Sequence, residues 1–93
     1  MVRGGADEQR RGIDRNSSYF DEFERLTKKL RQKIYQLRQY KNLTQEQMQN
    51  FELNLRQFQR IEGGETKNIT LSNLFKISKA FNISLSDMFK SLE

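Results

Sequence analysis

The stretch that decides the fold is residues 44–64, Thr-Gln-Glu-Gln-Met-Gln-Asn-Phe-Glu-Leu-Asn-Leu-Arg-Gln-Phe-Gln-Arg-Ile-Glu-Gly-Gly. Thr44 with a Gln three residues later predicts a capped helix over 44–51. Asn54 is a second natural N-cap, and the closing glycine pair can end its helix, over 54–62, in the left-handed conformation. Two short helices joined by a turn of about three residues have the geometry of a helix-turn-helix.

The chain before this stretch predicts one long helix. Apolar residues recur at helical spacing from Phe23 to Leu37, which is one stripe on a helix. Ser18 predicts the cap at its start, and Asn42 predicts its end because Asn tolerates the left-handed conformation. About two dozen residues is long for a helix in a small domain, so a break near Thr27 is an alternative.

The chain after this stretch predicts two more helices. Thr70 can cap a helix that Asn82 closes, and Ser84 opens a last helix with a capping box. The apolar residues of these two helices are Leu71, Leu74, Phe75, Ile77, Phe81, Leu85, Met88, Phe89 and Leu92. Proline is absent from the sequence, and no strand-like alternation appears in it. The expected fold class is therefore all-α with five helices.

Composition narrows the class of protein. The chain has 93 residues, 17 Lys plus Arg against 12 Asp plus Glu, a formal net charge of +5, and no Cys or His. This length suits one small domain, expected over 17–93, and residues 1–16 are expected to be a disordered arm or an expression remnant. Without thiolate or imidazole groups we expect no metal and no cofactor. The sequence lacks an apolar run of roughly 18 residues, which predicts a soluble intracellular protein.

The positive charge is concentrated before the helix-turn-helix. Seven basic residues and no acidic one lie from Arg25 to Lys41. Such a stretch is a candidate surface for a polyanion. A solvated face opposite the apolar stripe explains it equally well, so both interpretations stay open. Membrane attachment is not expected, because so small a domain needs the apolar stripe for its core.

The helix over 54–62 has the residue types that read a DNA groove. Phe58 and Ile61 are expected to point inward, which leaves polar side chains on the outer face. These are Arg56, Gln57, Gln59 and Arg60. Arg and Gln match the bidentate edges of guanine and adenine in the major groove. The preceding helix would brace this one across the phosphate backbone.

Three segments follow the order of a known family. They are Leu30-Arg-Gln-Lys-Ile-Tyr-Gln-Leu-Arg-Gln-Tyr-Lys-Asn-Leu-Thr-Gln-Glu, then Arg60-Ile-Glu-Gly-Gly, then Ile69-Thr-Leu with Leu74-Phe-Lys-Ile-Ser-Lys-Ala-Phe-Asn-Ile-Ser-Leu-Ser-Asp-Met-Phe. Over about residues 28–93 the chain resembles the phage repressor/Cro-type (Xre-like) helix-turn-helix family. The resemblance implies a five-helix fold like that of lambda repressor, with an extended first helix, in a cytoplasmic protein of bacterial or phage origin.

The resemblance also implies roles for individual residues. Base contacts are implied for Leu55, Arg56, Gln57, Gln59 and Arg60. Phosphate contacts are implied for Thr44, Gln45, Lys67, Asn68 and Thr70. Arg38 and Glu62 match a buried ion pair that ties the first helix to the end of the third. The dimer surface is expected at the last helix, at Met88, Phe89 and Leu92, with the N-terminal extension as a further part.

The chain departs from the family at several positions. Glu52 stands where the family usually has Gly in the turn, and a non-Gly residue at positive φ costs about 1 kcal/mol or more. Gln49 replaces a small Ala in the second helix, and residues 17–27 extend the first helix beyond the family core. Two assigned residues also have a structural alternative. Leu55 could be a buried staple, and Gln45 could be a simple helix cap.

Two classes of function follow from the sequence. The leading expectation is a sequence-specific double-stranded DNA-binding regulator of transcription, a repressor or autoregulator that acts as a homodimer on a palindromic operator. The alternative is a protein-interaction module, such as the antitoxin of a toxin–antitoxin pair, that binds its partner through residues 17–27. RNA binding has less support, because no aromatic stacking platform accompanies the basic residues. An enzyme is not expected, because phosphate-binding and nucleophile motifs are missing.

Overall fold

Short capped turns separate the helices in the computed structural model, which describes residues 13–66, 68–90 and 92. In chain order the helices are α2 (Phe20–Tyr40), the 3₁₀ helix η1 (Glu46–Phe51), α3 (Leu55–Gly63), α4 (Leu71–Phe81) and α5 (Leu85–Phe89). The described residues thus form a small all-α domain of five helices, with a long first helix and no strands. Residues 1–12 of the expected N-terminal arm lie outside the described residues, and 13–19 form turns and bends.

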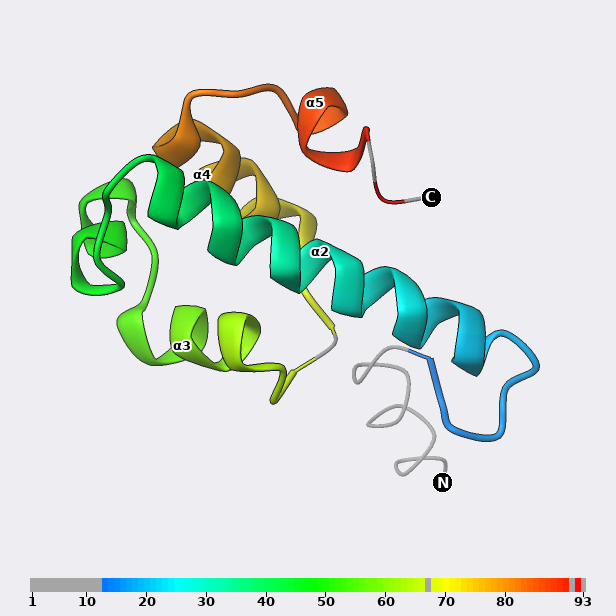
Figure 1. The fold of residues 1–93 in the computed structure, drawn as a ribbon. Helices are drawn as coiled ribbons and strands as arrows, with labels where there is room; N and C mark the ends of the chain where they lie inside the picture. The colour runs from blue at the N-terminus through cyan, green and yellow to red at the C-terminus, as the bar shows by residue number, and fades with distance from the viewer. Residues whose placement is uncertain (1–12, 67, 91, 93) are drawn as a thin grey trace.

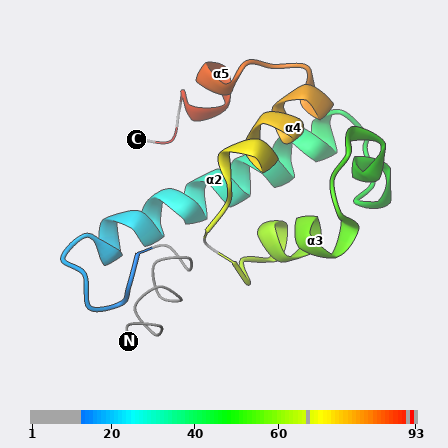
Figure 2. The same ribbon diagram turned by 180° about the vertical axis from the view of Figure 1, so that it is seen from behind.

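The long helix α2 organises the molecule. Figure 1 shows α2 running across the whole domain, with α3 on one side of it and α5 on the other. Figure 2 shows the same arrangement from behind, where α4 lies against the C-terminal half of α2. In both views the N-terminal half of α2 extends beyond α3 and α4. The short helix η1 therefore lies near the C-terminal end of α2, and α3 follows it along one side of that helix (Figure 1).

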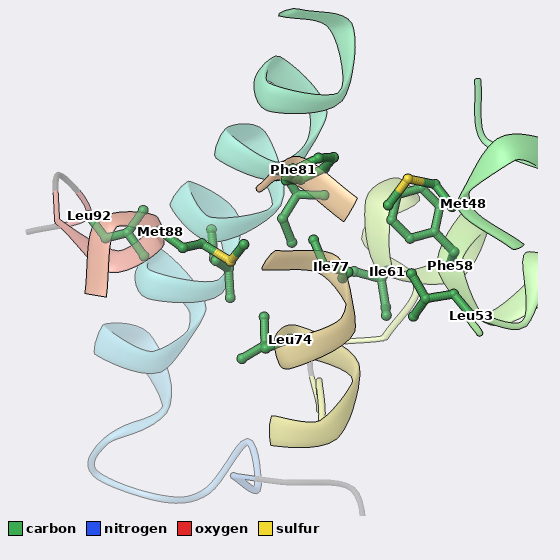
Figure 3. Close-up of a cluster of buried hydrophobic side chains, with 11 residues drawn as sticks. Met48, Leu53, Phe58, Ile61, Leu74, Ile77, Phe81, Met88 and Leu92 are labelled. Atoms are coloured by element: carbon green, nitrogen blue, oxygen red, sulfur yellow. The ribbon is translucent and has the colours of Figure 1, made fainter. Parts of the chain in front are cut away.

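One hydrophobic core lies where the helices meet (Figure 3). Its residues are Leu30, Ile34, Met48, Leu53, Phe58, Ile61, Leu74, Ile77, Phe81, Met88 and Leu92. Burying one large apolar side chain of this kind contributes about 1.5–3 kcal/mol to folding. Leu30 is the first residue of α2 in this cluster, so the ten residues of the helix before it lie outside the core.

Side-chain caps set most of the expected helix boundaries. Asn54, Thr70 and Ser84 each accept a hydrogen bond from the backbone N–H three residues later, at 2.9, 3.1 and 2.9 Å. Gly64 and Asn82 end α3 and α4 in the left-handed conformation, with φ of 83° and 57°. These caps confirm the predicted boundaries, because they satisfy backbone groups that a helix end leaves without partners.

The start of α2 differs from the prediction. The predicted cap at Ser18 is wrong, because the helix begins directly after Tyr19 and has no side-chain cap. Instead, the Ser17 hydroxyl accepts a hydrogen bond from the Tyr19 N–H at 3.1 Å, within the turn that precedes the helix. The helix has no break at Thr27, because residues Phe20–Tyr40 form one continuous α-helix. The Thr27 hydroxyl donates to the Glu24 carbonyl at 3.0 Å within it.

Two helices differ from their predicted form: the second is wound more tightly, and the last is shorter. The second is a 3₁₀ helix, in which backbone N–H groups bond to carbonyls three residues earlier. Its ends are fixed by the Thr44 cap and by the left-handed Glu52, and the tight winding suits so short a segment. The helix α5 ends at Phe89, but a further turn, with Leu92 N–H donating to the Phe89 carbonyl at 3.3 Å, brings Leu92 into the core.

Candidate nucleic-acid interface

The helix α3 is anchored by its apolar face. Its N-cap Asn54 accepts from the Gln57 N–H, and its C-terminus closes at the left-handed Gly64. Between these ends Phe58 and Ile61 are fully buried in the core. A nine-residue helix fixed along one side must present its other side to solvent, as the 3.6-residue period requires.

The outer face of α3 carries the polar residues that the sequence singles out. Arg56, Gln57, Gln59 and Arg60 are all exposed, and Leu55 at the helix start is partly buried. Arg60 Nε lies 3.8 Å from Glu65 Oε1, and such an exposed ion pair contributes little. Arg56 makes no side-chain hydrogen bond or ion pair within the described residues. The guanidinium of Arg56 is therefore available for a partner outside the domain.

A buried ion pair joins α3 to α2. Arg38 Nε donates to Glu62 Oε2 at 2.7 Å, and Arg38 Nη2 donates to Glu62 Oε1 at 2.9 Å. Arg38 Nη1 also donates to the Leu43 carbonyl at 2.7 Å, in the turn after α2. Both charged side chains are more than 90% buried. Because the contact is bidentate, it fixes the angle of the guanidinium to the carboxylate as well as their distance.

The same carboxylate also binds Gln45, at the N-terminus of η1. Gln45 Nε2 donates to Glu62 Oε1 at 2.7 Å, and Gln45 Oε1 accepts from Gln59 Nε2 at 3.4 Å. The Gln45 amide thus lies between Glu62 and Gln59 of α3, whereas the sequence pointed to a phosphate or a cap for it. A carboxamide nitrogen has two N–H groups, so one donor remains beyond the bond to Glu62.

Thr44 takes part in a reciprocal cap. Its hydroxyl accepts from the Gln47 N–H at 3.1 Å, and its own N–H donates to Gln47 Oε1 at 2.8 Å. This is the capping box that the sequence predicts. The hydroxyl proton of Thr44 has no acceptor among the described contacts, and the residue is exposed. It remains a donor at the surface.

The other candidate phosphate residues lie between α3 and α4. Asn68 and Thr70 are exposed, whereas Lys67 lies outside the described residues. The Thr70 hydroxyl accepts from the Asn73 N–H at 3.1 Å and lies 3.2 Å from Ser72 Oγ. Thr70 therefore has a structural role as the cap of α4, in addition to its place in the exposed loop.

The basic residues of α2 do not form one face. Arg38 is buried against Glu62, and Lys33 Nζ donates to the Asp87 carbonyl of α5 at 3.1 Å, on another side of the helix. Arg25, Lys28 and Arg31 line a groove of about 500 Å³ beside the segment that follows α3. Asp21, Glu24 and Thr66 line the same groove, which makes its charge mixed.

Arg31 in this groove packs closely on Gly64. A Cβ atom at Gly64 would lie 3.0 Å from the guanidinium carbon of Arg31, and Gly64 has a φ of 83°. The backbone conformation therefore favours glycine at the end of α3, and a larger residue there would also displace the Arg31 guanidinium.

The candidate dimer residues on α5 are divided between core and surface. Met88 is fully buried and Leu92 is 4% exposed, and both pack in the hydrophobic core. Phe89 is 38% exposed. Two of the three candidate dimer residues are therefore part of the core. Of the three, Phe89 alone is exposed and available for contact with another chain.

The sequence interpretation missed which apolar residues remain outside the core. Leu71 and Phe75 are 69% and 50% exposed, although the sequence analysis listed them with the other apolar residues of this helix without separating the two faces. They lie four residues apart, and Lys79 continues the same line with Nζ 5.2 Å from the Phe75 ring. The charged Lys79, four residues after Phe75, was the sequence signal that this side of α4 faces solvent.

Comparisons with known proteins give no match from which a function could be inferred, so the inference of function depends on the geometry of the site. No family model matches the chain, and neither a curated protein nor a solved structure does so. Within the described residues, no helix combines the length and the apolar character that crossing a membrane requires. The exposed polar face of α3, braced by η1 and α2, is the candidate site that these residues define.

Proposed function

We propose that this chain is a sequence-specific DNA-binding regulator of transcription of the phage repressor/Cro type, with a lambda-repressor-like fold. In this proposal α3 enters the major groove, and η1 braces it from the phosphate backbone. The observation that carries the proposal is the exposed row of Arg and Gln side chains on a helix whose opposite face is buried in the core. It is a binding function, and no catalytic step is part of it.

The proposed base contacts use the outer face of α3. Arg56 suits the O6 and N7 acceptors of guanine, because a guanidinium can donate to both at once. Gln57 and Gln59 can bind adenine or nearby phosphates, and Arg60 lies one turn beyond Arg56 on the same face. Leu55, half-buried at the helix start, can pack on a thymine methyl group.

The proposed phosphate contacts come before and after α3 in the chain. Thr44 and Gln45 lie at the start of η1, where helix N–H groups and side-chain donors favour an anion. Asn68 and Thr70 lie at the start of α4, with Lys67 beside them in the sequence. Contacts of this kind fix the register of α3 but do not read bases.

A homodimer is part of the proposal. One recognition helix offers too few base contacts for the affinity that a specific regulator needs. Two copies with recognition helices about 34 Å apart can read two half-sites of a palindrome on one face of the duplex.

The test is selection of bound fragments from a random duplex pool at two salt concentrations. We expect an enriched palindrome and an affinity that falls steeply with salt, because phosphate neutralisation releases counterions. On the selected site, Arg56→Ala should cost about 1–3 kcal/mol and relax the preference at one position of each half-site. Lys79→Ala, which removes an exposed charge at the far end of α4, is the matched control and should change affinity little.

An unenriched pool would overturn the proposal. So would a selected site on which Arg56→Ala and Arg60→Ala both bind as the wild type does, since α3 would then not be the reading element.

A further inference from the structure

A second surface lies at the N-terminal half of α2, away from α3. An apolar groove of about 770 Å³ runs along this half of the helix. Ile13, Tyr19, Phe23 and Leu26 line it, and Leu92 from the C-terminal end of the described chain does so as well. Tyr19 is 67% exposed and Leu26 is 39% exposed. The apolar stripe of α2 thus continues past the core onto the surface.

Among the described residues, the other helices do not cover the groove side of this part of α2. The residues of α2 before Leu30 lie outside the hydrophobic core, and Figures 1 and 2 show that half of the helix extending beyond α3 and α4. From outside α2, the described residues of the groove lining are Ile13 and Tyr19 of the turns before the helix and Leu92 near the C-terminal end. Leaving several apolar side chains together in water is costly, so such a groove marks an interaction surface.

The charges along this surface identify the partner. The charged residues of the groove lining are Glu22, Arg25 and Lys29. Glu22 and Lys29 lie seven residues apart, which is two helical turns or about 10 Å on one face. Both are exposed, and neither has an ion-pair partner among the described residues. An antiparallel copy of the same helix reverses this order. Glu22 of each copy would then face Lys29 of the other, with Leu26 close to the two-fold axis between them.

A parallel copy would oppose like charges at both positions, which disfavours it. The antiparallel arrangement instead pairs opposite charges at both of these positions and brings the apolar residues of the two copies together. Arg25, which also lines the groove, then lies near its own copy at the two-fold axis, a single like-charge contact against two opposite-charge contacts. The antiparallel arrangement satisfies the requirement of an isologous interface, in which each contact occurs twice.

We propose that this groove binds a second copy of the chain, through antiparallel contact of the N-terminal halves of two α2 helices. The inference rests on the homodimer of the proposed function and specifies its surface. The groove borders α5, because Leu92 lies in its lining and Lys33 of α2 binds the Asp87 carbonyl of α5. The interface therefore uses the extension of α2, with Leu92 at its edge, rather than the buried Met88 of α5.

The test is reciprocal charge exchange in the full chain, read by sedimentation equilibrium. Glu22→Lys alone and Lys29→Glu alone should each raise the dimer dissociation constant at least about tenfold, because each creates two like-charge contacts per dimer. The double variant restores opposite charges and should return the constant to within about threefold of wild type. Lys79→Glu, which reverses an exposed charge on α4, is the control and should leave the constant unchanged.

Three results would overturn the inference. They are a wild-type chain that stays monomeric at high micromolar concentration, single variants that dimerise as the wild type does, and a double variant no better than the singles. If another protein or the chain's own residues 1–12 fill the groove, the single variants change partner binding or melting temperature without changing the oligomeric state.

DNA binding is tested separately from dimerisation. Arg56→Ala should remain a dimer while it loses affinity for the selected DNA site. Glu22→Lys should lose the dimer but keep weak, salt-sensitive binding to one half-site, because α3 is intact. Loss of DNA binding alone therefore contradicts the proposed function, and loss of the charge-exchange pattern alone contradicts the dimer surface.

Discussion

Glu52 makes the turn between η1 and α3 with a φ of 65°, in the left-handed region. A Cβ atom in that conformation lies close to the next carbonyl oxygen, which costs about 1–2 kcal/mol. The Glu52 carbonyl accepts a hydrogen bond from Lys76 Nζ of α4 at 3.2 Å, so α4 supports the turn. The turn that aims α3 thus keeps its shape despite an unfavourable residue.

Replacing this residue by glycine should stabilise the domain. Glu52→Gly removes the Cβ contact but adds flexibility to the unfolded chain, so we expect a net gain of about 0.5–1 kcal/mol. Asn50→Gly is the control, because Asn50 lies within η1 and should lose stability when it becomes glycine. Thermal and urea unfolding measure both. A Glu52→Gly protein that melts below wild type would contradict the strain at this position.

At the scale of elements, the joint between α2 and α3 is held by a buried hydrogen-bond network. Arg38 and Glu62 are buried and share two short hydrogen bonds, and Gln45 binds the same carboxylate. Removing one partner would leave a buried charge with only part of its hydrogen bonds, which is far more costly than losing an exposed ion pair.

Arg38→Met should therefore destabilise the domain by about 3–5 kcal/mol. The double variant Arg38→Met/Glu62→Leu should lose clearly less, because it removes both charges and leaves apolar side chains in their place. Lys28→Met, at an exposed position of the same helix, is the matched control and should change stability by less than about 0.5 kcal/mol. Urea denaturation gives all three values. Equal losses in the single and double variants would show that packing, not the isolated charge, dominates.

At the scale of the whole molecule, the five helices share one core, so it should unfold in one cooperative step. Phe81, fully buried near the end of α4, is a test of this core. Phe81→Ala should cost about 3–5 kcal/mol, a large part of the stability of a domain this size. Leu71→Ala on the exposed line of the same helix should cost less than about 0.5 kcal/mol beyond its propensity effect. Circular dichroism during denaturation measures both.

The predictability of the fold differs between its local and its long-range features. Helix ends at Asn54, Thr70 and Ser84 follow from caps, which are signals carried by three or four neighbouring residues. The 3₁₀ winding of η1 could not be predicted, because it depends on how a short segment fits between two fixed ends. The burial of Met88 and Leu92 depends on packing into the core that the other helices form, which the local spacing of these residues does not reveal.

The candidate site shows the same division. The outward face of α3 follows from periodicity alone, since Phe58 and Ile61 fix the inner side. The hydrogen bond from Gln45 to Glu62 joins residues seventeen positions apart, and only their tertiary arrangement brings them together. The surface groove at Leu26 could not be predicted either, because a continuous apolar stripe does not show where the core ends.

The Glu62 carboxylate has a consequence for any partner that docks on α3. It accepts hydrogen bonds from Arg38 of α2 and from Gln45 at the start of η1, so three elements meet at one group. Tilting α3 would break several short bonds at once in a desolvated setting. The entropic cost of orienting α3 is therefore met when the chain folds. A partner that binds α3 then needs to immobilise little of the protein.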